Sequence, residues 1–211
     1  MFPSSLLQVQ ADIAACTLCG AAGYFAQHSS IVVNQPAGFD QRPRLMLVGQ
    51  APAAELRSKG RPFSGQAGRV LFGWLAQAGF EEEDFRAHCY FTAITKCYPG
   101  PAKGGVGRGD RVPSTKEQAL CRPFLSRELD IIQPELIITV GRLAMTYFLG
   151  LVDFTQTIGS TYECDGRTIL PLPHPSGVSR WNNAPENRAR VRQALTCLRS
   201  VSGMNSLVPK R

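Results

Sequence analysis

Short apolar segments alternate with helical segments along most of the chain, and this alternation restricts the fold more than any other feature. The expected strands are residues 45–48, 90–95, 136–140 and 168–172, and the expected helices are residues 67–78, 114–132, 142–149 and a last one from about 183. Strands that alternate with helices form a parallel sheet with helices on both faces. The pattern predicts an α/β fold: a three-layer α/β/α sandwich with a central, mainly parallel, four-stranded sheet.

Two local signals mark where the later helices begin. Ser114 stands before one helix and Glu117 follows three residues later, which is the spacing of a capping box. Pro185 falls in the first turn of the last helix, where a missing N–H is tolerated. With 211 residues, of which 44% are apolar, the chain can bury a single sizeable core. We expect one domain over residues 1–201 and a short tail over residues 202–211.

The charge of the chain favours an anionic partner. The net charge is +7, and nucleic acid is the commonest partner of a basic protein of this size. A basic surface that only aids solubility is the alternative. The first eight residues lack a basic start, and the longest apolar strand, residues 136–140, is far too short to cross a bilayer. We therefore expect an intracellular, cytoplasmic protein without a membrane anchor.

Seven cysteines in a reducing compartment indicate metal ligands or buried thiols rather than disulfides, and the odd count agrees. Cys16 and Cys19 form a C-x-x-C pair, and Cys97 and Cys121 could complete a site of four thiolates. This spacing does not separate zinc from an iron–sulfur cluster, and two unligated thiols at a helix end are the alternative. The other cysteines are expected to be ordinary core or surface residues: Cys89, Cys164 and Cys197.

Three loops follow the ends of expected strands, at residues 49–68, 95–113 and 174–183. In open α/β sheets, ligands bind beyond the carboxyl ends of the strands, where such loops converge. We expect one shared site there.

The loop motifs resemble those of a known family. Residues 49–52 read G-Q-A-P and residues 60–68 read G-R-P-F-S-G-Q-A-G, which is similar to the first motif of the iron–sulfur (family 4) uracil-DNA glycosylases. The further elements that occur in the same order as in the family are the C-x-x-C pair, Lys96-Cys97, Cys121, Val140-Gly141 and His174-Pro175-Ser176.

This resemblance implies a DNA-repair enzyme that hydrolyses the N-glycosidic bond of uracil, or of a related deaminated base, in single- or double-stranded DNA. It also implies a structural 4Fe-4S cluster on Cys16, Cys19, Cys97 and Cys121, and we expect a monomer associated with the nucleoid. Two alternatives stay open: a weakly active or inactive DNA-damage binding protein of the same fold, and a redox or zinc-binding module unrelated to DNA.

The resemblance also implies roles for particular residues, because base release requires a flipped base, a stabilised anion and a placed water. Phe63 would stack on the flipped base, although a core phenylalanine that caps the first helix is the alternative. His174 would donate to the carbonyl oxygen of the departing base. The remaining residues expected to contact substrate or DNA are Gly49, Ala51, Ser176, Val178, Arg180 and Trp181.

The sequence departs from the family where chemistry is expected. Gln50 replaces a family glutamate, and Glu55 is the only carboxylate between Pro52 and Phe63, so Glu55 is our candidate for activating water. Ala93 stands where the family has an asparagine that reads the uracil edge, and an alanine side chain has no group for this. Either Thr95 or Gln50 takes over, or the substrate range differs.

A third departure is an insertion at residues 99–113, whose glycines and basic residues suit contact with the DNA backbone. The candidate phosphate contacts are Lys103, Arg108, Arg111, Arg180 and Arg188, each of which has a solvated surface charge as its alternative.

Overall fold

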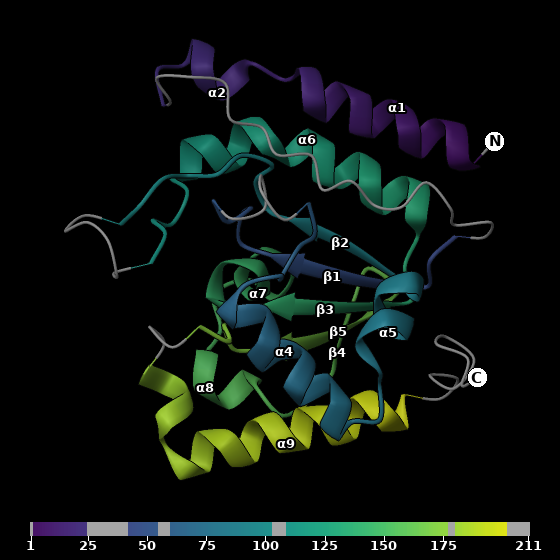
Figure 1. Cartoon of the computed structure of the whole chain (residues 1–211), viewed down its shortest axis with the longest axis vertical. Coiled ribbons are helices and arrows are strands. Elements are labelled where there is room, and N and C mark those ends of the chain that lie inside the picture. Colours follow the sequence, from purple (N-terminus) through teal and green to yellow (C-terminus); the bar gives the residue numbers. More distant parts are fainter. Residues whose placement is uncertain (1, 25–41, 55–59, 103–108, 177–179, 202–211) are drawn as a thin grey trace.

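Five strands form the middle layer of the molecule (Figure 1). A computed structural model describes residues 2–24, 42–54, 60–102, 109–176 and 180–201. The strands are β1 (Leu45–Gly49), β2 (Cys89–Ala93), β3 (Leu136–Val140), β4 (Tyr162–Cys164) and β5 (Arg167–Leu172). Their order is β2-β1-β3-β5-β4, and every pair is parallel except β4 with β5. The expected α/β sandwich is confirmed, and the tail at residues 202–211 lies outside the described residues.

The expected count of four strands is wrong, because β4 adds an antiparallel edge strand. It has three residues, too few to show an alternating pattern in the sequence. The tight turn that joins it to β5 contains Asp165 and Gly166, with φ of 50° and 71°. An Asp-Gly pair is a common hairpin signal because both turn residues need positive φ, so this strand had a readable signal.

Helices cover both faces of the sheet (Figure 1). The first face carries α1 (Phe2–Ala15), α6 (Thr115–Ile132) and α7 (Arg142–Leu149), and the second carries α4 (Gln66–Gln77), α5 (Glu82–His88) and α9 (Pro185–Ser200). Short helices lie in the connections: α2 (Leu18–Ala21), α8 (Phe154–Thr157) and the 3-10 helix η1 (Arg180–Asn183). Within the described ranges, no helix is long and apolar enough to cross a membrane.

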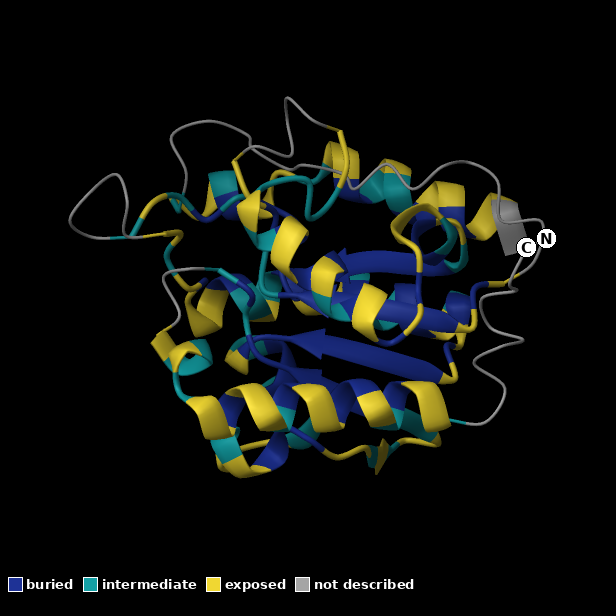
Figure 2. Ribbon diagram, turned by 60° about the horizontal axis from the view of Figure 1, so that its bottom comes forward, coloured by how far each residue is buried: buried dark blue, intermediate teal, exposed yellow. Residues whose placement is uncertain are grey.

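The strands β1, β2 and β3 are each buried along their whole length (Figure 2). Successive side chains point to opposite faces, so Leu45 and Leu47 pack under α4 and α9 while Met46 and Val48 pack under α6. Strands covered on both faces contain continuous apolar runs, as the sequence showed.

The expected capping box begins α6. The Glu117 N–H donates to Ser114 Oγ at 3.3 Å, and the Ser114 N–H donates to a Glu117 carboxylate oxygen at 2.8 Å. Arg111 binds the same carboxylate through two N–H groups, at 2.7 and 2.6 Å. The hydrogen bonds from Arg111 and Ser114 lower the pKa of Glu117 to about 2. The cap therefore also anchors the end of the insertion.

A buried ion pair connects the segment just after β2 to α6. Lys96 Nζ donates to Glu128 Oε2 at 2.7 Å, to Thr92 Oγ1 at 2.6 Å and to the Ala93 carbonyl at 2.7 Å. The hydroxyls of Tyr90 and Thr92 donate to the two oxygens of the same carboxylate. The side chains of Lys96 and Glu128 are only 7% and 3% exposed. Each charge is thus compensated where water cannot reach it.

Replacing Glu128 by Gln should lower the free energy of unfolding by about 3–5 kcal/mol, because it leaves the Lys96 ammonium buried without a counter-charge. The exposed Arg44–Glu135 pair provides the control, since Glu135→Gln should cost about 0–1 kcal/mol. Urea unfolding followed by circular dichroism measures both. Equal losses in the two variants would contradict the assigned importance of the buried pair.

Candidate functional site

A cavity of about 450 Å³ lies at the carboxyl ends of the parallel strands. Its lining residues are 49–54, 62–68, 92–93, 109–110, His174 and Ser176. All three loops that follow strand ends contribute, as expected. The chain passes from β1 to β2 on one side of it and later to β3 on its other side, which makes the end of β1 a topological switch point. Open α/β sheets bind ligands at such points, and the cavity lies beside this one.

Phe63 forms one wall of the cavity and also packs on the core, so the two interpretations of this residue combine. Its φ is +53°, a left-handed conformation. The ring lies against Gly49, where an added Cβ would lie 3.6 Å from the ring edge. A Cβ on Gly68 would lie 1.5 Å from the Phe63 carbonyl oxygen, so only glycine fits there. Gly68 therefore allows the Phe63 turn to stand at the pocket, and the Phe63 ring lies at ordinary contact distance from Gly49.

His174 lines the cavity just beyond the end of β5. Its side chain packs against Gly141, whose φ of +89° favours glycine. The Ser176 N–H donates to His174 Nδ1 at 3.2 Å, so the proton of the neutral ring lies on Nε2. Burial lowers the pKa of His174 below its usual value. The side chain is therefore a neutral hydrogen-bond donor at neutral pH.

Gln50 lies at the pocket, and its side-chain amide has a specific partner. Gln50 Nε2 donates to the Arg111 carbonyl at 3.2 Å, which connects the loop after β1 to the end of the insertion. The Thr95 hydroxyl is buried, lies outside the cavity lining and finds no hydrogen-bond partner within the described part of the chain. Of the two residues expected to replace the missing asparagine, Gln50 is the one that reaches the cavity.

Ala93 lies directly beside Gly49 in the register of the sheet and lines the cavity. Its carbonyl accepts from Lys96, and the neighbouring Thr92 hydroxyl both accepts from Lys96 and donates to Glu128. The polar groups on this wall are therefore already engaged with other residues of the chain.

Asp110 is a cavity-lining carboxylate that our sequence reasoning missed. It belongs to the insertion, whose base is a short antiparallel bridge between Pro101 and Asp110. The Ala102 N–H donates to the Gly109 carbonyl at 2.9 Å, and the Arg111 N–H donates to the Gly100 carbonyl at 3.0 Å. The basic composition of the loop drew attention to phosphate contacts, and only the fold brings its one acidic residue to the pocket.

The expected DNA-contacting residues fall in different environments. Arg180 is exposed at the start of η1. Trp181 packs edge-on against Phe154 with ring centroids 5.7 Å apart, and its indole N–H donates to Thr155 at 2.9 Å. Trp181 is thus engaged inside the protein in this conformation. Four expected residues lie outside the described ranges: Glu55, Lys103, Arg108 and Val178.

The four cysteines expected to bind metal influence one another electrostatically. Cys19, Cys97 and Cys121 are buried and Cys16 is half-buried. Burial, followed by the charges of the other three thiols, raises the pKa of Cys97 to about 12. The Lys96 backbone N–H donates to Cys121 Sγ at 3.1 Å, a contact that stabilises a ligating thiolate. As the described side chains stand, no group of three or more His, Cys, Asp or Glu is arranged to hold a metal ion.

The other three cysteines lie apart from this group. Cys89 is buried in β2, Cys164 Sγ contacts the Phe148 carbonyl and Cys197 Sγ contacts the Gly159 carbonyl. These three behave as ordinary core or partly exposed thiols, as expected.

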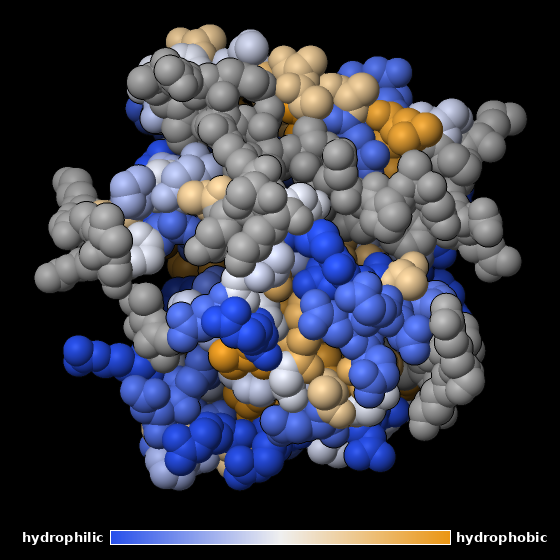
Figure 3. Space-filling model, viewed as in Figure 1, coloured by the Kyte–Doolittle hydropathy of each residue, from blue (hydrophilic) through white to orange (hydrophobic). Residues whose placement is uncertain are grey.

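A second cavity of about 330 Å³ adjoins the first, sharing Gln66 and Ser176 with it. It lies between α4 and α9, and its lining includes Trp74, Arg188 and Arg192. Hydrophilic side chains cover the neighbouring surface of α9 (Figure 3). The first cavity is therefore adjoined by a second one whose lining includes two arginines.

Comparisons with known proteins agree with this geometry. Residues 36–198 match the model of the Uracil DNA glycosylase superfamily. A Type-4 uracil-DNA glycosylase of Thermotoga maritima is 31% identical over 176 residues, which cover 82% of this chain and 83% of that protein. A Type-4 uracil-DNA glycosylase of Archaeoglobus fulgidus is 28% identical over 183 residues, with 82% and 83% covered. A Type-5 uracil-DNA glycosylase of Pyrobaculum aerophilum is 27% identical over 158 residues, with 68% and 66% covered. Because the family match spans the sheet and every loop around the pocket, this chain belongs to the uracil DNA glycosylase superfamily.

Proposed function

We propose that this protein is a monofunctional DNA-repair glycosylase that hydrolyses the N-glycosidic bond of uracil, or of a related deaminated base, in DNA. The observation that carries the proposal is the pairing of Phe63 with a neutral His174 in one cavity at the strand ends, in a chain of this superfamily. An aromatic face suits a flat base, and a neutral N–H donor suits a developing oxyanion.

The proposed reaction breaks the bond between the sugar C1′ and the base nitrogen. The bonding electrons leave with the base, and the negative charge spreads onto its carbonyl oxygen, where His174 Nε2–H donates a hydrogen bond. A water oxygen then bonds to C1′ and gives up a proton, leaving an abasic sugar and a free base. Phe63 holds the base plane while Gly49 and Ala51 bring backbone close to it.

The water needs a proton acceptor, and we retain Glu55 for this role. Gln50 carries no negative charge and its amide is bound to the Arg111 carbonyl, so it suits positioning rather than proton removal. Asp110 is the second candidate, because this acidic residue lines the same cavity. Replacing each by its amide separates the two.

We also propose that Cys16, Cys19, Cys97 and Cys121 hold a 4Fe-4S cluster. Four cysteines that are electrostatically coupled, largely buried and served by the Lys96 N–H make a donor set of the right chemistry. Such a cluster would supply iron–thiolate bonds that cross-link the segment around α2 to the loop after β2 and to α6. Its role here is structural.

DNA would approach along the second cavity, whose lining includes Arg188, Arg192 and Ser176, with the two arginines near phosphates. The loop that carries Ser176 and Arg180 would then lie near the vacated stack, and Val178, outside the described residues, stays a candidate there. A monomer acting on nucleoid DNA in the cytoplasm completes the proposal.

The decisive assay is base release from oligonucleotides carrying one modified base, single-stranded or paired, with abasic sites revealed by alkali. Uracil should be released.

At least one of hypoxanthine and xanthine should also be released, because Ala93 has no amide with which to reject a wrong base edge. Ala93→Asn should raise selectivity for uracil. Specific binding without any release would identify a damage-binding protein instead, and strict uracil specificity of the wild type would show that another residue reads the edge.

His174→Ala should slow base release by about 100- to 1000-fold with little change in DNA affinity, because the donor acts on charge that develops in the transition state. Burial lowers the pKa of His174 below its usual value, so the ring should be neutral at pH 7 and gain its proton at lower pH than an exposed histidine. Nitrogen NMR of the imidazole should show the proton on Nε2. A ring that is already protonated at pH 7 would contradict this assignment.

Purified protein should be yellow-brown, with iron and sulfide in near-equal amounts, because thiolate-to-iron charge transfer absorbs visible light. Cys121→Ser should remove the colour and damage folding, since the cluster cross-links distant segments. Cys197→Ser is the matched control and should keep the colour. Colourless protein with stoichiometric zinc would refute the cluster.

A further inference from the structure

Arg86, on α5, is a buried arginine that the proposed reaction does not use. Its side chain is 9% exposed, although the helix around it is strongly acidic and largely at the surface. A buried guanidinium needs partners for its N–H groups and its charge. Its partners show what it holds in place.

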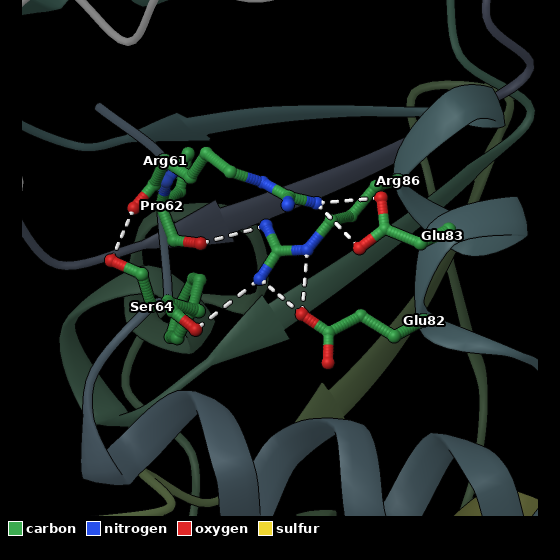
Figure 4. Close-up of polar contacts among 7 residues, drawn as sticks. Arg61, Pro62, Ser64, Glu82, Glu83 and Arg86 are labelled. Atoms are coloured by element: carbon green, nitrogen blue, oxygen red, sulfur yellow. Dashed lines mark hydrogen bonds and ion pairs between the residues drawn. The ribbon is translucent and has the colours of Figure 1, made fainter. Parts of the chain in front are cut away.

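The guanidinium binds the backbone of the turn that carries Phe63 (Figure 4). Arg86 Nη1 donates to the Pro62 carbonyl at 2.8 Å, and Nη2 donates to the Phe63 carbonyl at 3.3 Å. Arg86 Nε donates to Glu82 Oε1 at 2.9 Å, one helical turn earlier. One planar group thus bridges two consecutive carbonyls and a carboxylate.

The rings of Phe72 and Phe91 pack against the guanidinium of Arg86. Its central carbon lies 4.2 Å from the centre of the Phe72 ring and 5.5 Å from that of Phe91. Phe91 in turn packs against Phe63, with ring centroids 6.4 Å apart. The pocket aromatic is therefore braced twice, through its backbone by Arg86 and through its ring by Phe91.

The turn needs this support because Phe63 adopts a left-handed backbone conformation that is unfavourable for a residue with a side chain. Its carbonyl is directed between Gly68 and the guanidinium. Without Arg86 the Phe63 carbonyl would lose its charged donor. The hydrogen bond that helps to stabilise the positive φ of Phe63 would then be missing.

We propose that Arg86 is a positioning residue for base recognition: it fixes the Phe63 aromatic face before DNA arrives, and Glu82 fixes Arg86. The proposal rests on the proposed function and deepens it. A face that is already in place saves the entropy of ordering it when the base enters. Lysine cannot substitute fully, because a single ammonium cannot reach two carbonyls and a carboxylate while lying flat on a ring.

The test measures base release by the whole protein with Arg86→Lys, Glu82→Gln and, as the control, Glu83→Gln. Glu83 matches the change in charge, but it hydrogen-bonds the exposed side chain of Arg61 in the same loop, whereas Glu82 hydrogen-bonds Arg86 itself. We expect kcat/KM to fall about 10- to 100-fold in Arg86→Lys, less in Glu82→Gln, and not in Glu83→Gln.

A second experiment separates a positioning role of Arg86 from a general effect on stability: Arg86→Lys is repeated in a Phe63→Ala background. If Arg86 acts through the Phe63 face, Arg86→Lys should change kcat/KM less than about twofold once the ring is gone. A loss that persists in full without the ring overturns the proposal, and so does wild-type kcat/KM in Arg86→Lys. If Arg86→Lys does not fold, Glu82→Gln in the two backgrounds gives the same comparison. Wild-type protein that releases no base overturns the proposed function and this inference with it.

Discussion

The buried Lys96–Glu128 ion pair is the interaction on which both the cavity wall and the cysteine group depend. Through its ammonium, Lys96 holds the carbonyl and hydroxyl of two pocket residues, and through its own backbone N–H it contacts Cys121. The pocket wall and the cysteine group are therefore fixed by the same residue. A buried charge pair of this kind is sensitive to any change that separates its members, because neither charge can be left alone in the core.

The same network limits how the pocket can recognise a base. Ala93 contributes no side-chain donor or acceptor, and the Thr92 hydroxyl is engaged on both sides. The β2 wall therefore gives the pocket its shape but offers a ligand no free side-chain hydrogen-bonding group from Thr92 or Ala93. In the proposed function, discrimination between bases would therefore come from the loop after β1, from the base of the insertion and from His174, which also line the cavity. Polar readout is thus displaced from the sheet to the loops.

Most of the fold could be predicted from the sequence because its signals are local. Continuous apolar runs indicated the buried strands, and Ser114 with Glu117 indicated the start of α6, where the structure has a capping box. The edge strand β4 was missed because three residues carry no periodicity, although the turn at Asp165 and Gly166 was visible. Asp110 and Arg86 were missed for a different reason. Their importance comes from contacts with residues far away in sequence, and a carboxylate in a basic loop or an arginine in an acidic helix carries no local sign of such a contact.

The insertion at residues 99–113 has a hydrogen-bonded base at residues 100–102 and 109–111. The bonds between Ala102 and Gly109 and between Arg111 and Gly100, together with the Arg111–Glu117 contact, hold both ends of residues 103–108 to the body. Asp110 and the Gln50 contact at the pocket take their places from that base. Loosening the Arg111–Glu117 contact would therefore disturb an acidic residue and an amide at the pocket together, although Glu117 lies outside the cavity lining. The start of α6 thus acts as a remote support for one side of the pocket.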